Sequence, residues 1–370
     1  MREVLKDLVG WWRDGQPVGV ATVVSTWRSA PRAPGASMLV GPDGAAVGSV
    51  SGGCVEAAVY ELCRDVVETG QPTLARYGVS DDDAFAVGLT CGGIIDLFVE
   101  RIDPQRFPEL GAVAEAVEHG RPVAVATIVA GSADQLGRRM VVFPDERAGT
   151  LGSARLDDAT TDDVRGMLAS GRTGPLRYGL DGERRGDELQ LFVVSYAPPP
   201  RMLVFGAIDF AAAVAKLGSY LGYRVTVCDA RAVFATNRRF PDTEVVVDWP
   251  HRYLAGELEA GRLDERTVVC VLTHDPKFDV PVLDVALGQQ FAYVGAMGSR
   301  RTHDDRLARL QEAGVPDEHL ARLSSPIGLD LGARTPEETA VSIAAEIIAK
   351  RWGGGGQRLS ALDGRIHHEG

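Results

Sequence analysis

The sequence predicts an α/β chain with two different parts: an N-terminal α+β domain built from an internal duplication, and a C-terminal doubly wound parallel sheet. Three observations lead to this prediction. The N-terminal segment is repeated at a nearly constant offset, short apolar strands alternate with helices after residue 199, and the proline run 198–200 separates the two patterns. A stiff proline linker is typical of a domain boundary. We therefore expect domains at 1–198 and 199–353, with a flexible tail at 354–370.

The first copy of the repeat, about residues 16–102, follows a short amphipathic helix. The helix is predicted by apolar residues at helical spacing, namely Val4, Leu5, Leu8, Val9 and Trp12. The elements predicted after it are strands at 18–25, 37–40 and 94–101 and a helix at 55–69. Gly70, with a proline shortly after it, is a common helix stop.

The second copy, about residues 121–197, restates the first in four places. Residues 121–129 repeat 16–24, 150–153 repeat 46–49, 176–179 repeat 75–78, and 191–193 repeat 97–99. The first three offsets are 122 − 17 = 105, 152 − 48 = 104 and 177 − 76 = 101. Offsets this constant indicate a duplicated unit of strands and helices.

The two copies differ where glycine and cysteine are concentrated. The first copy carries Ser51-Gly52-Gly53-Cys54 before its helix and Cys91-Gly92-Gly93 before its last strand. At the matching offsets the second copy has Ala154-Arg155-Leu156-Asp157 and, at about 185–187, no cysteine. A requirement of the fold alone would have kept such residues in both copies, so we predict a site in the first copy. Glycines admit a ligand close to the backbone, and a helix N-terminus favours a thiolate or a bound anion.

After the prolines, apolar strands alternate with helices. Strands are predicted at 202–205, 225–229, 244–247, 267–272 and 291–294, with a helix at 210–221. This alternation is typical of a doubly wound parallel sheet of the Rossmann type. Gly206 follows the first strand directly, and Asp229 lies 23 residues further on, at the end of the second. That spacing suits a carboxylate that binds a ribose.

The glycine fingerprint of dinucleotide binding is broken in this chain. The expected G-x-G-x-x-G/A reads Gly206-Ala207-Ile208-Asp209-Phe210-Ala211. Ile208 stands where a missing side chain would let a pyrophosphate approach, and Asp209 adds a negative charge beside it. We therefore predict the Rossmann topology without the usual NAD(P) binding.

Further candidates lie at the predicted carboxyl ends of the strands, where this fold binds its ligands. His274 follows the fourth strand, although it could equally be a structural residue. Gly298-Ser299-Arg300 follows the fifth strand and offers backbone donors, a hydroxyl and a cation to a phosphate-class anion. A capping box, Thr335-Pro336-Glu337-Glu338, starts the closing helix and predicts a structural role for it.

Composition narrows the class of protein. The formal net charge of −12 argues against a nucleic-acid-binding surface. The five cysteines are too few for a disulfide framework, and no apolar run is long enough to span a membrane. The first residues are amphipathic and lack the apolar run of a signal peptide. We therefore expect a cytoplasmic protein with reduced thiols.

Motifs in both parts of the chain, in order, resemble one family: the XdhC/CoxI accessory proteins of xanthine dehydrogenase and related molybdenum hydroxylases. The motifs are residues 48–56 (GSVSGGCVE), 91–93 (CGG), 273–274 (TH), 293–300 (YVGAMGSR) and 326–330 (PIGLD). The resemblance covers nearly the whole chain. The loop at Ile208 and Asp209 departs from it, because the family usually has glycine and histidine there.

The resemblance implies a chaperone of molybdenum cofactor rather than an enzyme. Such a protein binds the cofactor transiently, assists its sulfuration by a cysteine desulfurase and hands it to the apo-hydroxylase. The residues expected to bind the cofactor are Ser51, Gly52, Gly53, Cys54, Glu56, Cys91, Gly92, Gly93, His274, Gly298, Ser299 and Arg300. Cys54 and Cys91 could contact molybdenum or its terminal sulfur, because thiolates suit soft partners. We expect the pocket between the N-terminal domain and the mouth of the Rossmann sheet.

Two other classes of function stay open. A nicotinamide-dependent oxidoreductase would use Asp229 and His274. A thiol hydrolase would need Cys54 and His274, the two candidate catalytic residues, within hydrogen-bond reach. The sequence also leaves open whether the chain has catalytic activity of its own and whether it forms a homodimer.

Overall fold

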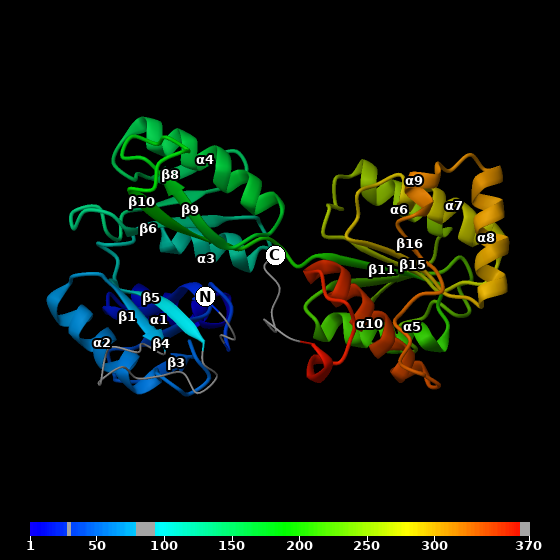
Figure 1. Ribbon diagram of the computed structural model, residues 1–370, viewed down its shortest axis with the longest axis horizontal. Helices are drawn as coiled ribbons and strands as arrows, with labels where there is room; N and C mark the ends of the chain where they lie inside the picture. Colours follow the sequence, from blue (N-terminus) through cyan, green and yellow to red (C-terminus); the bar gives the residue numbers. More distant parts are fainter. Residues whose placement is uncertain (28–30, 79–92, 363–370) are drawn as a thin grey trace. The chain divides into compact units, whose positions relative to one another are not determined.

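The computed structural model describes residues 1–27, 31–78 and 93–362. These residues form two compact units, Met1–Pro198 and the residues from Pro199 onward, which run in Figure 1 from blue to green and from green to red. Each unit has its own sheets and its own hydrophobic core. Within the described ranges, no helix combines the length and the apolar character needed to cross a membrane.

The first half of the N-terminal unit is an antiparallel sheet with helices beside it. Its strands are β1 (Val18–Trp27), β2 (Ser37–Val40), β3 (Ala46–Gly48), β4 (Thr73–Gly78) and β5 (Ile94–Ile102), in the spatial order β3-β2-β1-β5-β4. The chain enters through a 3-10 turn, η1 (Arg2–Val4), and helix α1 (Leu5–Arg13). α2 (Glu56–Thr69) packs its apolar side on the strands and ends at Gly70, whose φ of 71° is left-handed.

The second half repeats this arrangement. Its strands are β6 (Ala124–Ala130), β7 (Arg139–Val142), β8 (Arg147–Gly149), β9 (Gly174–Tyr178) and β10 (Leu189–Ser195), in the order β8-β7-β6-β10-β9. Helix α3 (Leu110–Glu118) precedes them, and α4 (Ala154–Ala169) stands in the place of α2. The two strand orders match position for position, so the predicted duplication is confirmed.

The repeat register predicted around the glycine motif is wrong by three residues. Gly48 pairs with Met38 at the end of β3, and the residue that pairs in the same way with Met140 is Gly149, not Gly152. The offset here is therefore 149 − 48 = 101. The sequence match misled because a second Gly-Ser pair lies in the loop after β8.

The two sheets of the N-terminal unit share a core. The side chains that meet between them are Val24, Phe98, Val129 and Phe192. A buried ion pair joins Glu100 of β5 to Arg139 of β7, and the guanidinium of Arg139 lies 4.5 Å from the centre of the Phe107 ring. These three side chains help to line a cavity of about 40 Å³. The lining of this cavity is therefore apolar except for the charged pair and a few hydroxyl groups.

The C-terminal unit is built on one parallel sheet. Its strands are β11 (Arg201–Phe205), β12 (Arg224–Cys228), β13 (Glu244–Val246), β14 (Val268–Val271), β15 (Tyr293–Ala296) and β16 (Leu323–Ser324). They lie in the order β13-β12-β11-β14-β15-β16, which is the 3-2-1-4-5-6 order of the Rossmann fold. The predicted doubly wound sheet is confirmed.

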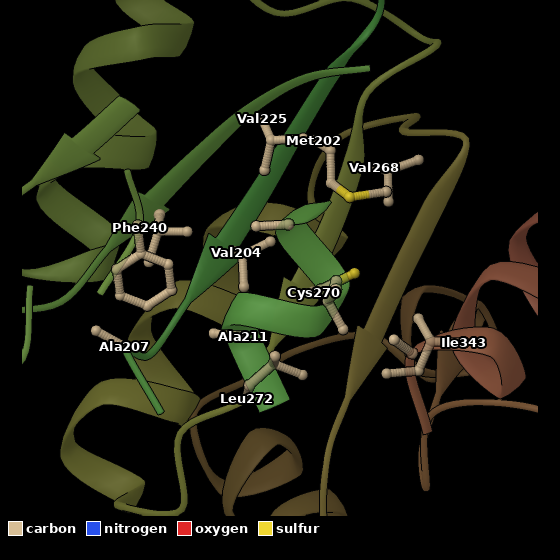
Figure 2. Packing of buried hydrophobic residues seen from close by; sticks show 14 of the residues in the cluster. Met202, Val204, Ala207, Ala211, Val225, Phe240, Val268, Cys270, Leu272 and Ile343 are labelled. Carbon is tan, nitrogen blue, oxygen red and sulfur yellow. The ribbon is translucent and has the colours of Figure 1, made fainter. Parts of the chain in front are cut away.

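Helices cover both faces of this sheet. α5 (Asp209–Tyr220) and α10 (Pro336–Trp352) pack on one face, where Ala211 and Ile343 lie with Val204 and Cys270 of the strands in one apolar cluster (Figure 2). The opposite face carries α6 (Pro250–Glu259), α7 (Pro276–Leu287), α8 (Arg300–Glu312) and the short α9 (Asp317–Leu320). The helix that follows β11, α5, packs on one face of the sheet, and the helix that follows β14, α7, packs on the other. The carboxyl ends of these neighbouring strands therefore form the switch point at which this fold binds ligands.

The closing helix α10 begins as predicted. The Thr335 side chain accepts from the N–H of Glu338, and the Glu338 carboxylate accepts from the N–H of Thr335, which completes the capping box. The tail that follows contains a 3-10 turn, η2 (Leu359–Ala361), and residues 363–370 of the predicted tail lie outside the described residues.

Candidate functional site

The glycine loop between β3 and α2 is closed around a carboxylate of the chain itself. Glu56, the first residue of α2, accepts hydrogen bonds from the N–H groups of Ser51 (2.9 Å) and Gly53 (2.8 Å) and from the hydroxyl of Ser49 (2.6 Å). The Ser51 hydroxyl also donates to Glu56 and accepts from the N–H of Cys54 at 3.0 Å. The backbone donors expected to hold an anion at this helix start are thus bonded to the protein's own carboxylate.

The negative charge of Glu56 is strongly stabilised in this position. Partial burial by itself would raise the pKa of its carboxyl, but the hydrogen bonds from Ser49 and Ser51 outweigh that effect. Together they lower the pKa from its ordinary 4.5 to about 2. Glu56 is therefore ionised at neutral pH and organises the loop as an internal anion.

We expect Glu56→Gln to destabilise the protein by about 1–3 kcal/mol near neutral pH, because a neutral amide loses the charge-assisted hydrogen bonds. The folded pKa lies below the unfolded one, so this contribution is complete above about 4.5 and is lost as the pH falls toward about 2. Urea unfolding of both proteins from neutral to acidic pH measures the difference, which should shrink on acidification. Glu61→Gln, an exposed position on the same helix, is the matched control. A difference that stays constant with pH would contradict this assignment.

Gly52 and Gly53 form the outer side of the same loop. Both are exposed, with φ of 75° and 116°, a region that residues with a Cβ rarely adopt. Among the described residues, no atom beyond the adjacent ones lies within 4 Å of the position that a Cβ would take on either glycine. Cys54, half-buried, follows directly. The structure thus places an open stretch of backbone next to a cysteine.

The second copy keeps the carboxylate in its loop. At the corrected offset of 101, Asp157 stands in the place of Glu56, and it accepts from the N–H of Leu151 and the hydroxyl of Thr150, both at 2.7 Å. The alignment predicted from the sequence set Asp157 against Cys54, so it did not match the two carboxylates. Because both copies direct a carboxylate into this loop, we interpret Glu56 as a structural residue. It is therefore distinct from the open part of the site at Gly52, Gly53 and Cys54.

The second copy does not keep the open backbone. α4 begins at Ala154, the equivalent of Gly53, whereas α2 begins only at Glu56. The residue equivalent to Cys54 is Arg155, whose guanidinium is paired with Asp181 at 2.8 Å. One turn that is helical in the second copy is therefore unwound in the first, at the glycines and the cysteine.

Cys54 is the most accessible cysteine of the part of the chain that the structure describes. The other three are buried in hydrophobic cores: Cys63, Cys228 and Cys270. Burial raises the pKa of each of these thiols to about 12. Buried thiols of this kind are inert, so they are packing residues.

The second glycine–cysteine cluster is described only in part. Cys91 and Gly92 lie outside the described residues, and Gly93 is buried immediately before β5. Among the residues that are described, no three His, Cys, Asp or Glu side chains come together as a metal site. A molybdenum contact through Cys54 and Cys91 therefore stays a prediction.

In the loop after β11, a backbone N–H group that a dinucleotide would need is hydrogen-bonded within the protein. Gly206 has a left-handed φ of 108°, and a Cβ there would lie 2.8 Å from the methyl group of Thr273. The N–H of Ala207 donates to the carboxylate of Asp229 at 2.8 Å. Arg231 donates to both oxygens of the same carboxylate, at 2.9 and 2.8 Å. Asp229, the predicted ribose ligand, is therefore buried and engaged by the chain's own groups.

Asp209 of the altered fingerprint also has a partner within this unit. Arg239 donates to the carboxylate of Asp209 and to the carbonyl oxygen of Ala207, both at 2.8 Å. Phe234 lies against the guanidinium groups of Arg231 (4.7 Å) and Arg239 (5.8 Å). The sequence analysis missed both arginines. The available signal was the introduced charge of Asp209, which calls for a cation nearby.

The candidates of the C-terminal unit lie at the carboxyl ends of neighbouring strands. His274 follows β14 and is exposed. Gly298 and Ser299 follow β15, and Ser299 caps α8 by accepting from the N–H of Thr302 at 3.1 Å. Arg300, the first residue of α8, is exposed beside it. Because β14 and β15 are parallel partners, the structure brings these groups to one edge of the sheet.

A buried arginine that the sequence analysis missed holds these loops together. Arg306 of α8 donates to the carboxylate of Asp279 (3.0 Å), the hydroxyl of Ser325 (2.9 Å) and the carbonyl oxygen of Met297 (2.8 Å). Asp279 also accepts from the hydroxyl of Thr273, next to the candidate histidine. The loops after β14, β15 and β16 are thus fixed to one another through a single guanidinium and its carboxylate.

The two groups of candidates belong to different units. Gly52, Gly53 and Cys54 lie in the N-terminal unit, and His274 and the Ser299 turn lie in the C-terminal one. The structure brings His274 and the Ser299 turn to one edge of the sheet, whereas Cys91 and Gly92 lie outside the described residues. A pocket that combines both groups stays a prediction.

Family models match both units of the chain. One described as the XdhC Rossmann domain matches residues 202–347, and that of the XdhC and CoxI family matches residues 11–78 and 116–179. The two segments of the second match start 116 − 11 = 105 and end 179 − 78 = 101 residues apart. These are the offsets of the duplication.

Individual relatives cover almost the whole chain. A Bacillus subtilis (strain 168) protein, named as a probable subunit of xanthine dehydrogenase, is 28% identical over 340 residues, 91% of this chain and 94% of that protein. The molybdenum cofactor insertion chaperone PaoD of Escherichia coli (strain K12) is 27% identical over 350 residues, 95% of this chain and 88% of PaoD. A crystal structure described as a xanthine dehydrogenase from Bacillus halodurans is similar with a TM-score of 0.69, at 25% identity and over 97% of both chains. With both units matched, the chain belongs to the XdhC and CoxI family.

Proposed function

We propose that this chain binds molybdenum cofactor transiently, assists its sulfuration and inserts it into a xanthine dehydrogenase-type molybdenum hydroxylase. Family membership and the chaperone among the relatives support an accessory role for a molybdenum enzyme. The observation in this chain that carries the proposal is the open turn at Gly52, Gly53 and Cys54, which the second copy lacks. The cofactor is cargo here rather than a resident group.

The open turn fits such a cargo. Molybdopterin holds its metal through a dithiolene, so the metal end of the cofactor is soft, and a thiolate is a suitable partner for it. Cys54 lies just before α2, half-buried beside the open glycines. Gly52 and Gly53 let a bulky planar ligand approach the backbone beside that sulfur. Cys91 is proposed as the second thiolate of the same site.

The phosphate of the cofactor needs a different place. In the glycine loop the N–H groups of Ser51 and Gly53 are already bonded to Glu56. We propose that Gly298-Ser299-Arg300 binds the phosphate, with His274 beside it, because an exposed hydroxyl and cation stand there at the N-terminus of a helix of 13 residues.

The engaged state of Asp229 supports the proposal that NAD(P) is not the ligand. A ribose would have to displace Arg231 and the N–H of Ala207 from its carboxylate. We expect titration with NADH and NADPH, followed by cofactor fluorescence, to show no saturable binding. Tight binding would instead favour an oxidoreductase that uses Asp229 and His274. The thiol hydrolase alternative would need Cys54 of one unit and His274 of the other within hydrogen-bond reach.

The proposed sequence of events requires two protein partners. A cysteine desulfurase supplies the terminal sulfur, and an apo-hydroxylase receives the loaded cofactor. We propose no catalytic step for the chain itself, although Cys54 and His274 are the residues to test for one. We also propose a cytoplasmic location, where the thiols would be reduced.

We expect Cys54→Ala to lower the molybdenum that copurifies with the chain by roughly tenfold or more, because loss of a contact near a metal typically has that effect. Molybdenum by mass spectrometry and the pterin by fluorescence after oxidation are measured separately. Arg155→Ala, at the equivalent position of the second copy, is the matched control and should retain wild-type levels. Retention by Cys54→Ala equal to that of the wild-type protein would remove this cysteine from the site.

A further inference from the structure

Helix α10 has an apolar stripe on its outer side. Its inner side chains Ile343 and Ile347 are buried in the cluster with the strands of the sheet, and Figure 2 shows Ile343 there. On the outside, Val341 is 51% exposed, Ile348 45% and Trp352 51%. Their spacings of seven and four residues place these three side chains along one line of the helix surface.

This stripe contrasts with the outer surface of another helix of the same unit. α8, on the opposite face, turns charged side chains to solvent, among them Arg300, Arg301, Asp304 and Asp305. Ordinary solvation would favour the same on α10. A line of large apolar side chains at this place instead indicates a contact surface.

We propose that two copies of this chain associate through the outer stripe of α10, packed antiparallel about a two-fold axis. A dimer of this kind would not depend on the proposed cargo. In a two-fold contact each residue must find its complement on the same surface of the other copy. The apolar stripe meets itself, which satisfies this condition.

The charges at the two ends of α10 favour the antiparallel arrangement. Glu337 lies in the first turn and Arg351 in the last, and both are exposed. Antiparallel packing places Glu337 of each copy near Arg351 of the other and aligns the helix dipoles favourably, whereas parallel packing would place like charges together. The midpoint between these two residues is (337 + 351)/2 = 344, next to Ala345. A small residue at the crossing lets the two helices approach closely.

The contact also has the composition of a binding hot spot. Trp352 lies at one end of the stripe, with the guanidinium of Arg351 stacked 4.9 Å from the centre of its ring. Tryptophan and arginine are the residue types that most often dominate interface energies. Each two-fold contact would contain this pair twice.

The test is the molecular mass of the full-length chain in solution, measured by size-exclusion chromatography with light scattering over a range of concentrations. We expect a dimer, which Ile348→Glu converts to monomer with an unchanged circular dichroism spectrum. Leu180→Glu, which changes an exposed leucine of the N-terminal unit, is the matched control and should stay dimeric. A wild-type chain that is monomeric at every concentration, or a dimer that Ile348→Glu leaves intact, would overturn the proposal.

A charge exchange tests the antiparallel geometry separately. Glu337→Arg and Arg351→Glu should each weaken the dimer, by roughly tenfold in the dissociation constant, because each places like charges together twice. The double variant restores the complementarity between the copies, so it should recover most of the wild-type affinity. Two additive losses without recovery would contradict the proposed pairing.

Discussion

Replacing Arg306 with leucine is expected to destabilise the C-terminal unit by about 3–5 kcal/mol, because it leaves the carboxylate of Asp279 buried without its cation. The two side chains are only 3% and 5% exposed. The same change removes the hydrogen bonds from Arg306 to Ser325 and to the carbonyl oxygen of Met297. Urea unfolding followed by circular dichroism measures the loss.

Two variants separate the buried charge from other effects of this substitution. Arg309→Leu removes an arginine of the same helix that forms an exposed ion pair with Asp305, and we expect it to cost less than about 0.5 kcal/mol. The double variant Arg306→Leu with Asp279→Leu removes both charges and should recover part of the stability. If Arg306→Leu were as mild as Arg309→Leu, the network would not hold the loops at this edge of the sheet.

Arg139→Met is expected to have a comparable effect on the N-terminal unit, again about 3–5 kcal/mol. It leaves Glu100 buried between the two sheets and removes the guanidinium packed on Phe107. The cavity of about 40 Å³ beside the pair is lined mainly by apolar side chains, which cannot replace the lost cation. The unfolding free energy, measured near neutral pH, should fall accordingly.

The pH dependence of this variant has a definite sign. Burial raises the pKa of Glu100, and the charge of Arg139 opposes that effect, so removal of Arg139 raises it further. A carboxyl whose folded pKa lies above its unfolded one is costly when ionised, so the variant should recover stability as the pH falls and the carboxyl takes up a proton. Arg138→Met, the adjacent and exposed arginine paired with Asp134, is the control. A loss that does not shrink on acidification would contradict the role given to Glu100.

The architecture of the chain could be predicted because it depends on patterns that are local in sequence. Alternating strands and helices define the Rossmann sheet, and the repeat defines the two antiparallel sheets. The predicted register between the copies was wrong where it depended on two residues, since the Gly-Ser at 152–153 lies three residues after the true match at Gly149. Strand pairing, and not residue identity, fixes that equivalence.

The candidate site was predictable only where its chemistry is local. Gly52, Gly53 and Cys54 are adjacent in the sequence, so the free backbone of the glycines and the thiol beside it could be predicted without the fold. Arg239 and Arg306 could not, because their partners lie 30 and 27 residues away and only the folded sheet brings them together. The inward direction of Glu56 could not be predicted either, because it becomes evident only beside its structural counterpart Asp157.

The unwound turn before α2 has a consequence for engineering. Its counterpart in the second copy is regular helix from Ala154 onward, so the two halves of the N-terminal unit no longer carry the same constraints. Stabilising substitutions in a functional turn often reduce activity. Here, helix-favouring changes can be confined to the second half, which lacks the open glycines and the cysteine. A more heat-resistant variant that keeps the proposed cofactor binding should therefore be sought among substitutions in residues 121–197.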